Sequence, residues 1–426
     1  MRWHAIADDL SGAAEVAGAL LNFAPPRAPL DAAQNAQKAR HPSLHGRAVL
    51  ELAPSLPLTN AAMLHTDSGA ALTVIDSDNR SRTAREAFDR LSILLADIDV
   101  ATPLFLKFDS LLRGNIGAEL TAVRAQRPVV FCPAVPHNGR TVVDGVMLVN
   151  GQPLHLTELW AAEGRTPATT IGGQLGAVSS VPDWELVGDT QFVTLTLAQV
   201  RSTELEQLLR DAADLGAIII SDAETSADLE RIAVASLRLG FALAGAAGLA
   251  AAVAPFVATT PEPTRAPGGS DTLPDPSSAD TVFVLGTAST ALQAQLTALS
   301  AVGVPVLRLT LTQLADATLP AGTIAVVVTA PVEPHLSATI VRGLAALAAR
   351  DSDGRHLVLS GGETARAVLD ELNITQLRPL AQAHPGAVVS VSGTGRLIAT
   401  RPGSYGAPDS LVEILATVRT LQPHHL

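Results

Sequence analysis

Residues 104–115, Leu-Phe-Leu-Lys-Phe-Asp-Ser-Leu-Leu-Arg-Gly-Asn, place several chemically useful side chains directly after an apolar run. The segment contains two cations, a carboxylate, a hydroxyl and a glycine, at Lys107, Asp109, Ser110, Arg113 and Gly114. Lys107 is unusual because the chain contains only one other lysine, Lys38, among 29 lysines and arginines. Such a set at the end of a strand is suited to binding a small polar anion. The alternative is an ordinary strand end with a surface ion pair and a helix cap.

A second set of polar groups follows the first apolar run of the chain, where Asp8 and Asp9 are adjacent. Two neighbouring carboxylates can bind Mg²⁺, accept a proton from a substrate hydroxyl, or divide these roles between them. Ser11 comes next, and its hydroxyl can cap a following helix. The alternative is an acidic helix start that is stabilised by the helix dipole.

Two more segments repeat this arrangement of polar residues after a short apolar run. Asp78 and Arg80 follow one such run, and His137 and Arg140 follow another. Ligands of open α/β sheets bind at the carboxyl ends of the strands, so all of these segments are expected to meet at one edge of a sheet. Two Arg–carboxylate contacts of about 1.5–3 kcal/mol each could hold a small acid at roughly micromolar to millimolar affinity.

The second half of the chain has a glycine-rich segment of a different kind. In Ser-Gly-Gly-Glu-Thr-Ala, residues 360–365, a strand runs through two glycines into a helix. Backbone N–H groups at such a helix start can cradle a phosphate, although the lysine-containing Walker motif is absent from the sequence. The alternative is a tight turn with an acidic helix start. Ser289 follows another strand in a similar way, and the segment with Gly403 and Gly406 could close over a nucleotide.

Composition argues against several other classes of function. The net charge is −12, and no basic stripe is interleaved with aromatic residues, which argues against nucleic-acid binding. The 11 histidines show no metal-binding spacing, and no serine-hydrolase elbow occurs. The single cysteine, Cys132, excludes an intrachain disulfide and is expected to be a buried core thiol. Residues 1–10 show no signal peptide, and residues 240–257 are too short and interrupted to span a membrane, so we expect a cytoplasmic protein without a membrane partner.

Short apolar runs alternate with amphipathic segments along the chain. Strands are expected at residues 3–8, 72–76, 104–108, 129–132, 217–221, 282–285, 304–309, 324–329, 357–360 and 388–391. Helices are expected at residues 83–96, 116–124, 204–215, 227–239, 337–349, 364–372 and 410–421. This alternation predicts an α/β fold in which parallel or mixed sheets are flanked by helices. Because 426 residues exceed what one core usually supports, two domains are expected.

A proline-rich stretch divides the chain. Residues 258–280 hold five prolines and few apolar residues, so they are expected to link one domain at residues 1–257 to another at residues 281–426. Residues 25–57 are also rich in proline and show no period. They are expected to form a long excursion on the first domain.

Taken in order, these motifs resemble those of the four-carbon acid sugar kinase family, which contains the threonate, erythronate and 3-oxo-tetronate kinases. Residues 6–13 are similar to the family's I-A-D-D-L-T-G-A, and residues 107–115 to K-x-D-S-T-L-R-G-N. Residues 133–145 resemble P-A-x-P-x-x-G-R-x-T-x-x-G, residues 360–365 match S-G-G-E-T-A, and residues 401–406 resemble K-P-G-N-F-G. The match is collinear over nearly the whole chain.

The resemblance implies an ATP-dependent kinase that phosphorylates a hydroxyl of a short sugar acid with the help of Mg²⁺. The implied catalytic residues are Asp8, Asp9 and Lys107, with one aspartate orienting or deprotonating the hydroxyl and the other assisting Mg²⁺. The implied substrate-binding residues are Ser11, Asp78, Arg80, Asp109, Ser110, Arg113, Gly114, His137 and Arg140. The implied ATP-binding residues are Ser289, Gly361, Gly362, Glu363, Thr364, Gly403 and Gly406. The partners would be the sugar acid and ATP, and a homo-oligomer is compatible with the sequence.

Several positions depart from the family pattern. Glu15 stands where an aspartate is usual, Val143 replaces a threonine, and residues 161–165 replace an expected Asp-Pro turn. Residues 286–289 lack the family's Ser-Cys pair. These departures leave the identity of the acid open. They also leave two alternatives: a kinase of a different small hydroxy acid, and a regulatory protein that binds the acid and the nucleotide without phosphoryl transfer.

Overall fold

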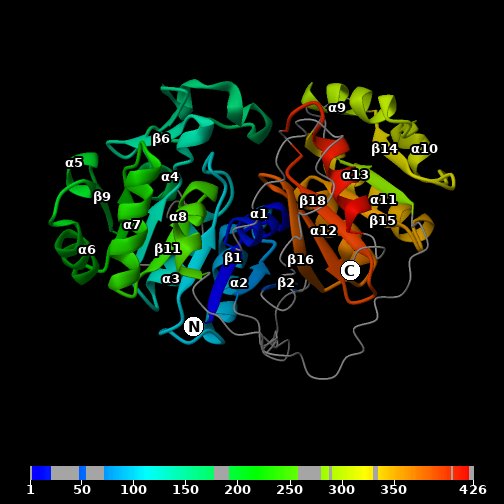
Figure 1. The fold of residues 1–426 in the computed structure, drawn as a ribbon. Helices are drawn as coiled ribbons and strands as arrows, with labels where there is room; N and C mark the ends of the chain where they lie inside the picture. The colour runs from blue at the N-terminus through cyan, green and yellow to red at the C-terminus, as the bar shows by residue number, and fades with distance from the viewer. Residues whose placement is uncertain are drawn as a thin grey trace, which may run out of the picture. The chain divides into compact units, whose positions relative to one another are not determined.

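The computed structural model describes residues 2–20, 48–53, 72–176, 191–257, 280–286, 290–329, 334–403 and 406–421. These residues form two compact units, and β-strands alternate with α-helices in both (Figure 1). Of the described residues, the first unit contains 2–20, 52–53, 72–176 and 191–257, and the second unit contains the others. The α/β class predicted from the sequence is therefore confirmed. The predicted linker, residues 258–280, lies outside the described residues except for Asp280.

The first unit is built on a parallel sheet. Its described strands follow the spatial order β3 (Leu72–Asp76), β1 (Trp3–Ala7), β4 (Leu104–Lys107), β11 (Ala242–Gly245), β5 (Val129–Cys132), β10 (Ile218–Ser221) and β9 (Phe192–Leu195). All neighbouring pairs are parallel. The register places Ala7, the last residue of β1, beside Asp76 of β3 and Lys107 of β4. The polar segments that follow these strands therefore begin side by side at one edge of the sheet.

Helices cover this sheet on both faces. They are α1 (Leu10–Leu20), α2 (Ala84–Ala96), α3 (Ile116–Arg124), α4 (Ile171–Gly176), α5 (Leu197–Val200), α6 (Leu205–Asp214), α7 (Ser226–Arg238) and α8 (Ala247–Val257). Every residue of β1, β3, β4 and β5 is buried, which requires cover on each face. Packing of α2 against α3, and of α1 and α7 against α8, provides it. No helix in the described parts of the chain is both long and apolar enough to cross a membrane.

Local sequence signals determine how some of these elements begin and end. Thr83 and Glu86 form a capping box at the start of α2, in which each side chain bonds the backbone of the other residue. Gly245 ends β11 beside β5. A Cβ at Gly245 would lie 2.2 Å from the carbonyl oxygen of Cys132, so the close approach of these strands requires glycine.

A small antiparallel sheet carries the segment with Arg140. It consists of β6 (Arg140–Val143), β7 (Val146–Val149) and β8 (Gln152–Pro153), and short 3₁₀ helices flank it at η1 (Pro136–Asn138), η2 (Leu154–Leu156) and η3 (Glu158–Glu163). Asp144 and Gly145 connect β6 to β7 with φ values of 50° and 70°, as a type I′ turn requires. The carboxylate of Asp222, directly after β10, accepts the N–H groups of Asp144 at 2.7 Å and Gly145 at 2.9 Å. This contact anchors the hairpin to an end of the parallel sheet.

The second unit is built on a mixed sheet. Its described strands follow the order β13 (Val306–Leu309), β14 (Ile324–Val328), β12 (Thr281–Leu285), β15 (His356–Ser360), β18 (Leu397–Arg401), β17 (Ala387–Ser392), β16 (Gln376–His384) and β2 (Ala48–Leu52). The first five are parallel, and the last three add antiparallel strands. The helices of this unit are α9 (Thr290–Ala301), α10 (Leu311–Leu314), α11 (Pro334–Asp351), α12 (Gly362–Glu371) and α13 (Ser410–Thr420).

β2 departs from the sequence prediction. The sequence predicts an excursion on the first domain over residues 25–57, but residues 50 and 51 pair with β16 of the second unit. Leu50 lies beside Leu377 and is fully buried, and Glu51 lies beside Gln376. The sequence of a five-residue strand does not show which sheet the strand joins, because the strand that it pairs with is distant in sequence. Apart from residues 48–53, this excursion lies outside the described residues.

Candidate active site

Arg80 joins the two carboxylates that follow β1. Its Nη2 lies 2.6 Å from Oδ1 of Asp8, its Nε lies 2.9 Å from Oδ2 of Asp8, and its Nη1 lies 2.7 Å from Oδ2 of Asp9. The backbone N–H groups of Asn79 and Arg80 both donate to the carbonyl oxygen of Asp8 at 3.0 Å. Both the guanidinium group and the backbone N–H of Arg80 thus bind the residues that follow β1. These bonds hold the carboxylates of Asp8 and Asp9 in place.

Asp8 and Asp9 differ in exposure. The side chain of Asp8 is 0% exposed and that of Asp9 is 16% exposed. Burial raises the pKa of Asp8, although the charge of Arg80 opposes this effect. Asp9 also caps α1, because its Oδ1 accepts the N–H of Gly12 at 2.8 Å, whereas Ser11 lies inside the helix and is buried. Asp9 is therefore the more accessible of the two carboxylates.

Lys107 is held beside these carboxylates at the end of β4. Its Nζ lies 2.8 Å from Oε2 of Glu15, and its side chain is 6% exposed. Burial alone lowers the pKa of Lys107, but the carboxylates of Glu15 and Asp9 outweigh it, so the pKa is raised and the ammonium stays charged. A Cβ at Gly12 would lie 2.8 Å from Oδ1 of Asp9, so glycine allows the close approach of the Asp9 carboxylate to the start of α1. Glu15, which faces Lys107, was not among the predicted site residues.

Asp109 and Arg113 form a bidentate pair in the segment after β4. Nε of Arg113 lies 2.8 Å from Oδ2 of Asp109, and Nη2 lies 2.7 Å from Oδ1. Burial raises the pKa of Asp109, but the hydrogen bonds and charge of Arg113 hold it well below its usual range. Gly114 follows with φ of 88°, and a Cβ there would lie 3.3 Å from Oδ2 of Asp8 and from Cγ of Arg80. Glycine at this position lets the loop close against the Asp8–Arg80 pair.

Arg140 differs from the other cations of this edge. One of its terminal nitrogens, Nη1, donates to the hydroxyl of Ser110. Within the described residues Arg140 forms no ion pair, and its Nε is buried without a hydrogen-bond partner. Of the other predicted residues, Asp78 pairs with Arg82 at 2.5 Å, and His137 is exposed on η1. Among the described residues, Arg140 therefore lacks the carboxylate partner that Arg80, Lys107 and Arg113 each have.

The glycine-rich segment of the second unit lies where β12, β15 and β18 end. Gly361 has φ of 98°, its N–H donates to the carbonyl of Arg401 at 3.0 Å, and α12 begins at the next residue. Gly286, at the end of β12, packs directly on α12, because a Cβ there would lie 1.8 Å from Oγ1 of Thr364. The N–H groups of residues 362–364 open the helix, where a phosphate can bind.

Gly406 is positioned by a buried network. Gln295 of α9 donates from Nε2 to the carbonyl of Gly406 at 3.0 Å and accepts at Oε1 from Nη1 of Arg401 at 2.9 Å. Sequence reasoning named Gly403 and Gly406 but missed Gln295, because a glutamine on a helix gives no signal of its buried partner. Ser289 lies outside the described residues.

Residues 3–253, more than half of the chain, match the family model described as a sugar-binding N-terminal domain. Residues 282–411 match the model described as a nucleotide-binding C-terminal domain. The chain belongs to the four-carbon acid sugar kinase family.

Relatives in this family span the whole chain. A Cupriavidus necator protein named D-threonate kinase is 29% identical over 442 residues, covering 96% of this chain and 96% of its own. A Methylobacterium radiotolerans protein named 3-oxo-tetronate kinase is 27% identical over 441 residues, covering 95% of this chain and 96% of its own. A solved structure from Salmonella typhimurium LT2 has a TM-score of 0.69 at 18% identity, covering 97% of this chain and 98% of its own, which shows a shared fold.

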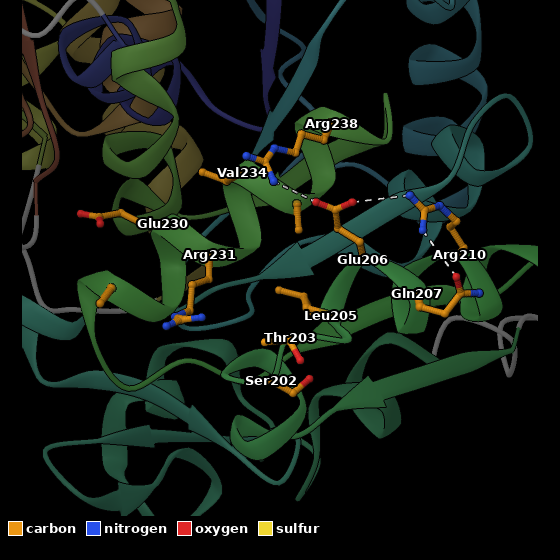
Figure 2. Close-up of a pocket in the computed structure, with 12 residues that line it drawn as sticks. Ser202, Thr203, Leu205, Glu206, Gln207, Arg210, Glu230, Arg231, Val234 and Arg238 are labelled. Carbon is orange, nitrogen blue, oxygen red and sulfur yellow. Dashed lines mark hydrogen bonds and ion pairs between the residues drawn. The ribbon is translucent and has the colours of Figure 1, made fainter.

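A groove on the first unit is separate from the candidate site. It has a volume of about 820 Å³ and is lined by α6, α7 and the turn before α6 (Figure 2). Glu206 lies between Arg210 at 3.5 Å and Arg238 at 3.1 Å, so these charges pair with one another. None of the predicted site residues lines the groove.

Proposed function

We propose that this protein transfers the γ-phosphoryl group of ATP to a hydroxyl of a short sugar acid of four carbons, such as threonate, erythronate or 3-oxo-tetronate. The relatives named D-threonate kinase and 3-oxo-tetronate kinase support this choice. In this proposal residues 1–257 form the acid-binding domain, residues 258–280 the linker and residues 281–426 the nucleotide-binding domain. The observation that carries the proposal is the sheet edge where Arg80 bridges Asp8 and Asp9 and where Glu15 holds Lys107.

Arg140 is the proposed anchor of the substrate carboxylate. Arg80, Lys107 and Arg113 each have a carboxylate partner at 2.6–2.8 Å, whereas Arg140 donates to a hydroxyl. A planar guanidinium with available donors suits a carboxylate, because it can bind both oxygens at once. Ser110, which accepts from Arg140, would keep the guanidinium of Arg140 oriented, and Asp109 would hold Arg113 in place.

Asp9 is the proposed acceptor of the hydroxyl proton. It is the more accessible carboxylate, and its two oxygens each keep a lone pair beyond the bonds from Arg80 and Gly12. Asp8 would hold Arg80 in place. Lys107, whose charge is secured by Glu15, would offset negative charge on the transferred phosphoryl. Phosphoryl transfer requires mainly such positioning and neutralisation.

The nucleotide would be held by the second unit. The N–H groups at the start of α12, with Gly361, Gly362, Glu363 and Thr364, suit the phosphates, and the loop with Gly403 and Gly406 would lie over them. Mg²⁺ is commonly bound by one or two carboxylates together with substrate phosphates, and the accessible oxygens of Asp9 fit that requirement. The ion would supply positive charge between phosphate oxygens.

The test is ADP release with Mg-ATP against a panel of threonate, erythronate, their 2- and 3-oxo forms and longer aldonates. Turnover with a four-carbon acid, reduced at least about 100-fold in Asp9→Asn, is the expected result. Turnover with only a longer or branched acid would change the substrate but keep the reaction. Nucleotide binding without turnover on any acid would contradict the proposal and favour a regulatory binding protein.

A further inference from the structure

Glu119 is a buried carboxyl beneath the candidate site. It lies on α3 and is 1% exposed. Its Oε2 accepts a hydrogen bond from Nδ2 of Asn79 at 2.9 Å. Its Oε1 is also buried and has no hydrogen-bond partner among the described residues. A carboxylate with one such bond is poorly compensated for the loss of water, whereas a neutral carboxylic acid tolerates this environment far better.

Asn79 connects Glu119 to the turn that carries Arg80. Its amide group also donates to the carbonyl of Ala87 at 3.3 Å and accepts from Nε of Arg90 at 3.3 Å, so it is fixed against α2. Its backbone N–H donates to the carbonyl of Asp8 at 3.0 Å. The side chain of Asn79 thus links α2 to α3, and its backbone N–H links both helices to the turn that holds the two aspartates.

The charged groups around Glu119 favour its neutral form. Burial and the nearby carboxylate of Asp8 raise the pKa of Glu119 to about 8, and the hydrogen bond from Asn79 and the charge of Arg80 oppose them only in part. The elements packed on α3 also carry ionisable groups, which are Arg85, Glu86, Asp89 and Arg90 on α2 and Cys132 on β5. Arg85 pairs with Asp89 and Glu86 bonds Thr83, while Arg90 donates to Asn79 and to the carbonyl of Ser77. Within the described parts of the chain, none of these groups forms a hydrogen bond with the Glu119 carboxyl.

We propose that Glu119 is a positioning residue that acts as the neutral acid, through Asn79, to keep Arg80 bridging Asp8 and Asp9. The proposal deepens the kinase function proposed above and rests on it. Ionisation would place a third carboxylate beneath Asp8. It would attract Arg80 away from the two aspartates and pull the Asn79 amide towards Glu119 and away from the carbonyl of Ala87. The two aspartates would then lose the geometry in which Asp9 can meet the hydroxyl.

The test is the pH dependence of kcat/KM for the acid that the panel identifies, measured from about pH 6 to about pH 9.5. The unsubstituted protein should lose activity with an apparent pKa of about 8, about tenfold by pH 9. Glu119→Gln, which is always neutral and keeps the size of the side chain, should match it within about twofold at pH 7 and lack the alkaline loss. Glu230→Gln, an exposed change on α7, should keep the alkaline loss.

Three results would overturn the proposal. They are an alkaline loss that persists in Glu119→Gln, a large loss of its activity at pH 7 with the fold intact, and no alkaline loss in the unsubstituted protein. If Glu119→Gln does not fold, Asn79→Ala decides the question. It should lower kcat at least about tenfold with KM for ATP unchanged, and an unchanged kcat would refute the positioning role.

Failure of the kinase function itself is distinguishable from failure of this inference. If no acid is phosphorylated, the pH dependence of urea unfolding still reports on Glu119. A carboxyl whose folded pKa is raised from 4.5 to about 8 contributes stability that is lost as pH rises through that window. The unsubstituted protein should therefore lose more stability than Glu119→Gln between about pH 5 and about pH 8.5. Equal losses would overturn the inference.

Discussion

At the scale of single residues, the candidate site is defined by which cation pairs with which carboxylate. Motif order in the sequence named Lys107, Arg113 and Arg140 together, but it could not show that two of them are paired with acids and the third with a hydroxyl. Which cation pairs with which carboxylate depends on where each side chain points at the end of its strand, and the order of motifs in the sequence does not contain this information. For this reason Glu119, which has an ordinary position on a helix, could not be recognised as part of the site from the sequence, and Glu15 was noted only as a departure from the family pattern.

Arg140 gives the sharpest prediction at this scale. Arg140→Ala should raise KM for the acid about 10- to 100-fold, because a guanidinium–carboxylate contact contributes about 1.5–3 kcal/mol. KM for ATP should not change. Arg140→Lys should recover only part of the loss, since an ammonium lacks the planar fork. Steady-state kinetics with both substrates varied would measure these values.

Arg210→Ala is the matched control for Arg140→Ala, because Arg210 lies in the groove of Figure 2 and is partly exposed. It should leave both KM values unchanged. If Arg140→Ala also left KM for the acid unchanged, the substrate carboxylate would have to bind elsewhere.

At the scale of elements, the alternation of apolar runs and amphipathic segments was sufficient to predict most strands and helices near the two candidate sites. The predicted strand ranges omit β11 and β18 beside the two sites, and β2, β9, β16 and the small antiparallel sheet elsewhere. β16, for example, carries proline, arginine and glutamine in place of a continuous apolar run. The packing of Gly286 on α12 was also missed. A single glycine at a strand end has many explanations, and the helix it meets is more than seventy residues later in the sequence.

Gly286→Ala should disturb the nucleotide site through this contact. A Cβ placed 1.8 Å from Oγ1 of Thr364 forces β12 and α12 apart. The expected cost is about 1–3 kcal/mol of unfolding free energy, with weaker ATP binding. Urea unfolding and titration calorimetry would measure the two effects.

Gly393→Ala provides the comparison, since nothing lies within 4 Å of a Cβ there and Gly393 is not among the glycines with positive φ. It should change stability by less than about 0.5 kcal/mol. Normal ATP affinity in Gly286→Ala would show that the start of α12 does not hold the phosphates.

At the scale of the whole molecule, the order of elements predicted the α/β class. The resemblance to the acid sugar kinases implied an acid-binding and a nucleotide-binding half, and the two family models match that division. The sequence did not predict that residues 48–51 join the second unit. It also gave no account of buried histidines. His356 on β15 accepts the N–H of Leu397 at Nδ1, at 3.2 Å, and its Nε2 is buried without a partner among the described atoms.

His356 should contribute to acid sensitivity of the fold. Burial lowers its pKa from 6.5 to about 4, with a smaller effect from the charge of Arg396. Between these values the unfolded chain binds more protons than the folded chain, so the stability from neutral His356 is present above 6.5 and is lost as pH falls towards 4. The loss should be roughly 3 kcal/mol, and His356→Gln should remove it.

Urea unfolding at about pH 7 and about pH 4.5 would measure this difference. The exposed His137→Gln change serves as the control and should leave the pH dependence as it is. A pH dependence unaffected by His356→Gln would show that folding does not lower the pKa of His356.

The pairing of β2 with β16 has a consequence for synthesis of the chain. Glu51 and Gln376 are 325 residues apart in sequence, so a ribosome that adds roughly 5–20 residues per second completes the second strand roughly 16–65 s after the first. During that interval the nascent segment around Leu50 has no β16 to pair with and offers an apolar edge to other chains. The nucleotide-binding unit can close its sheet only near the end of translation, with a strand that was made close to the beginning.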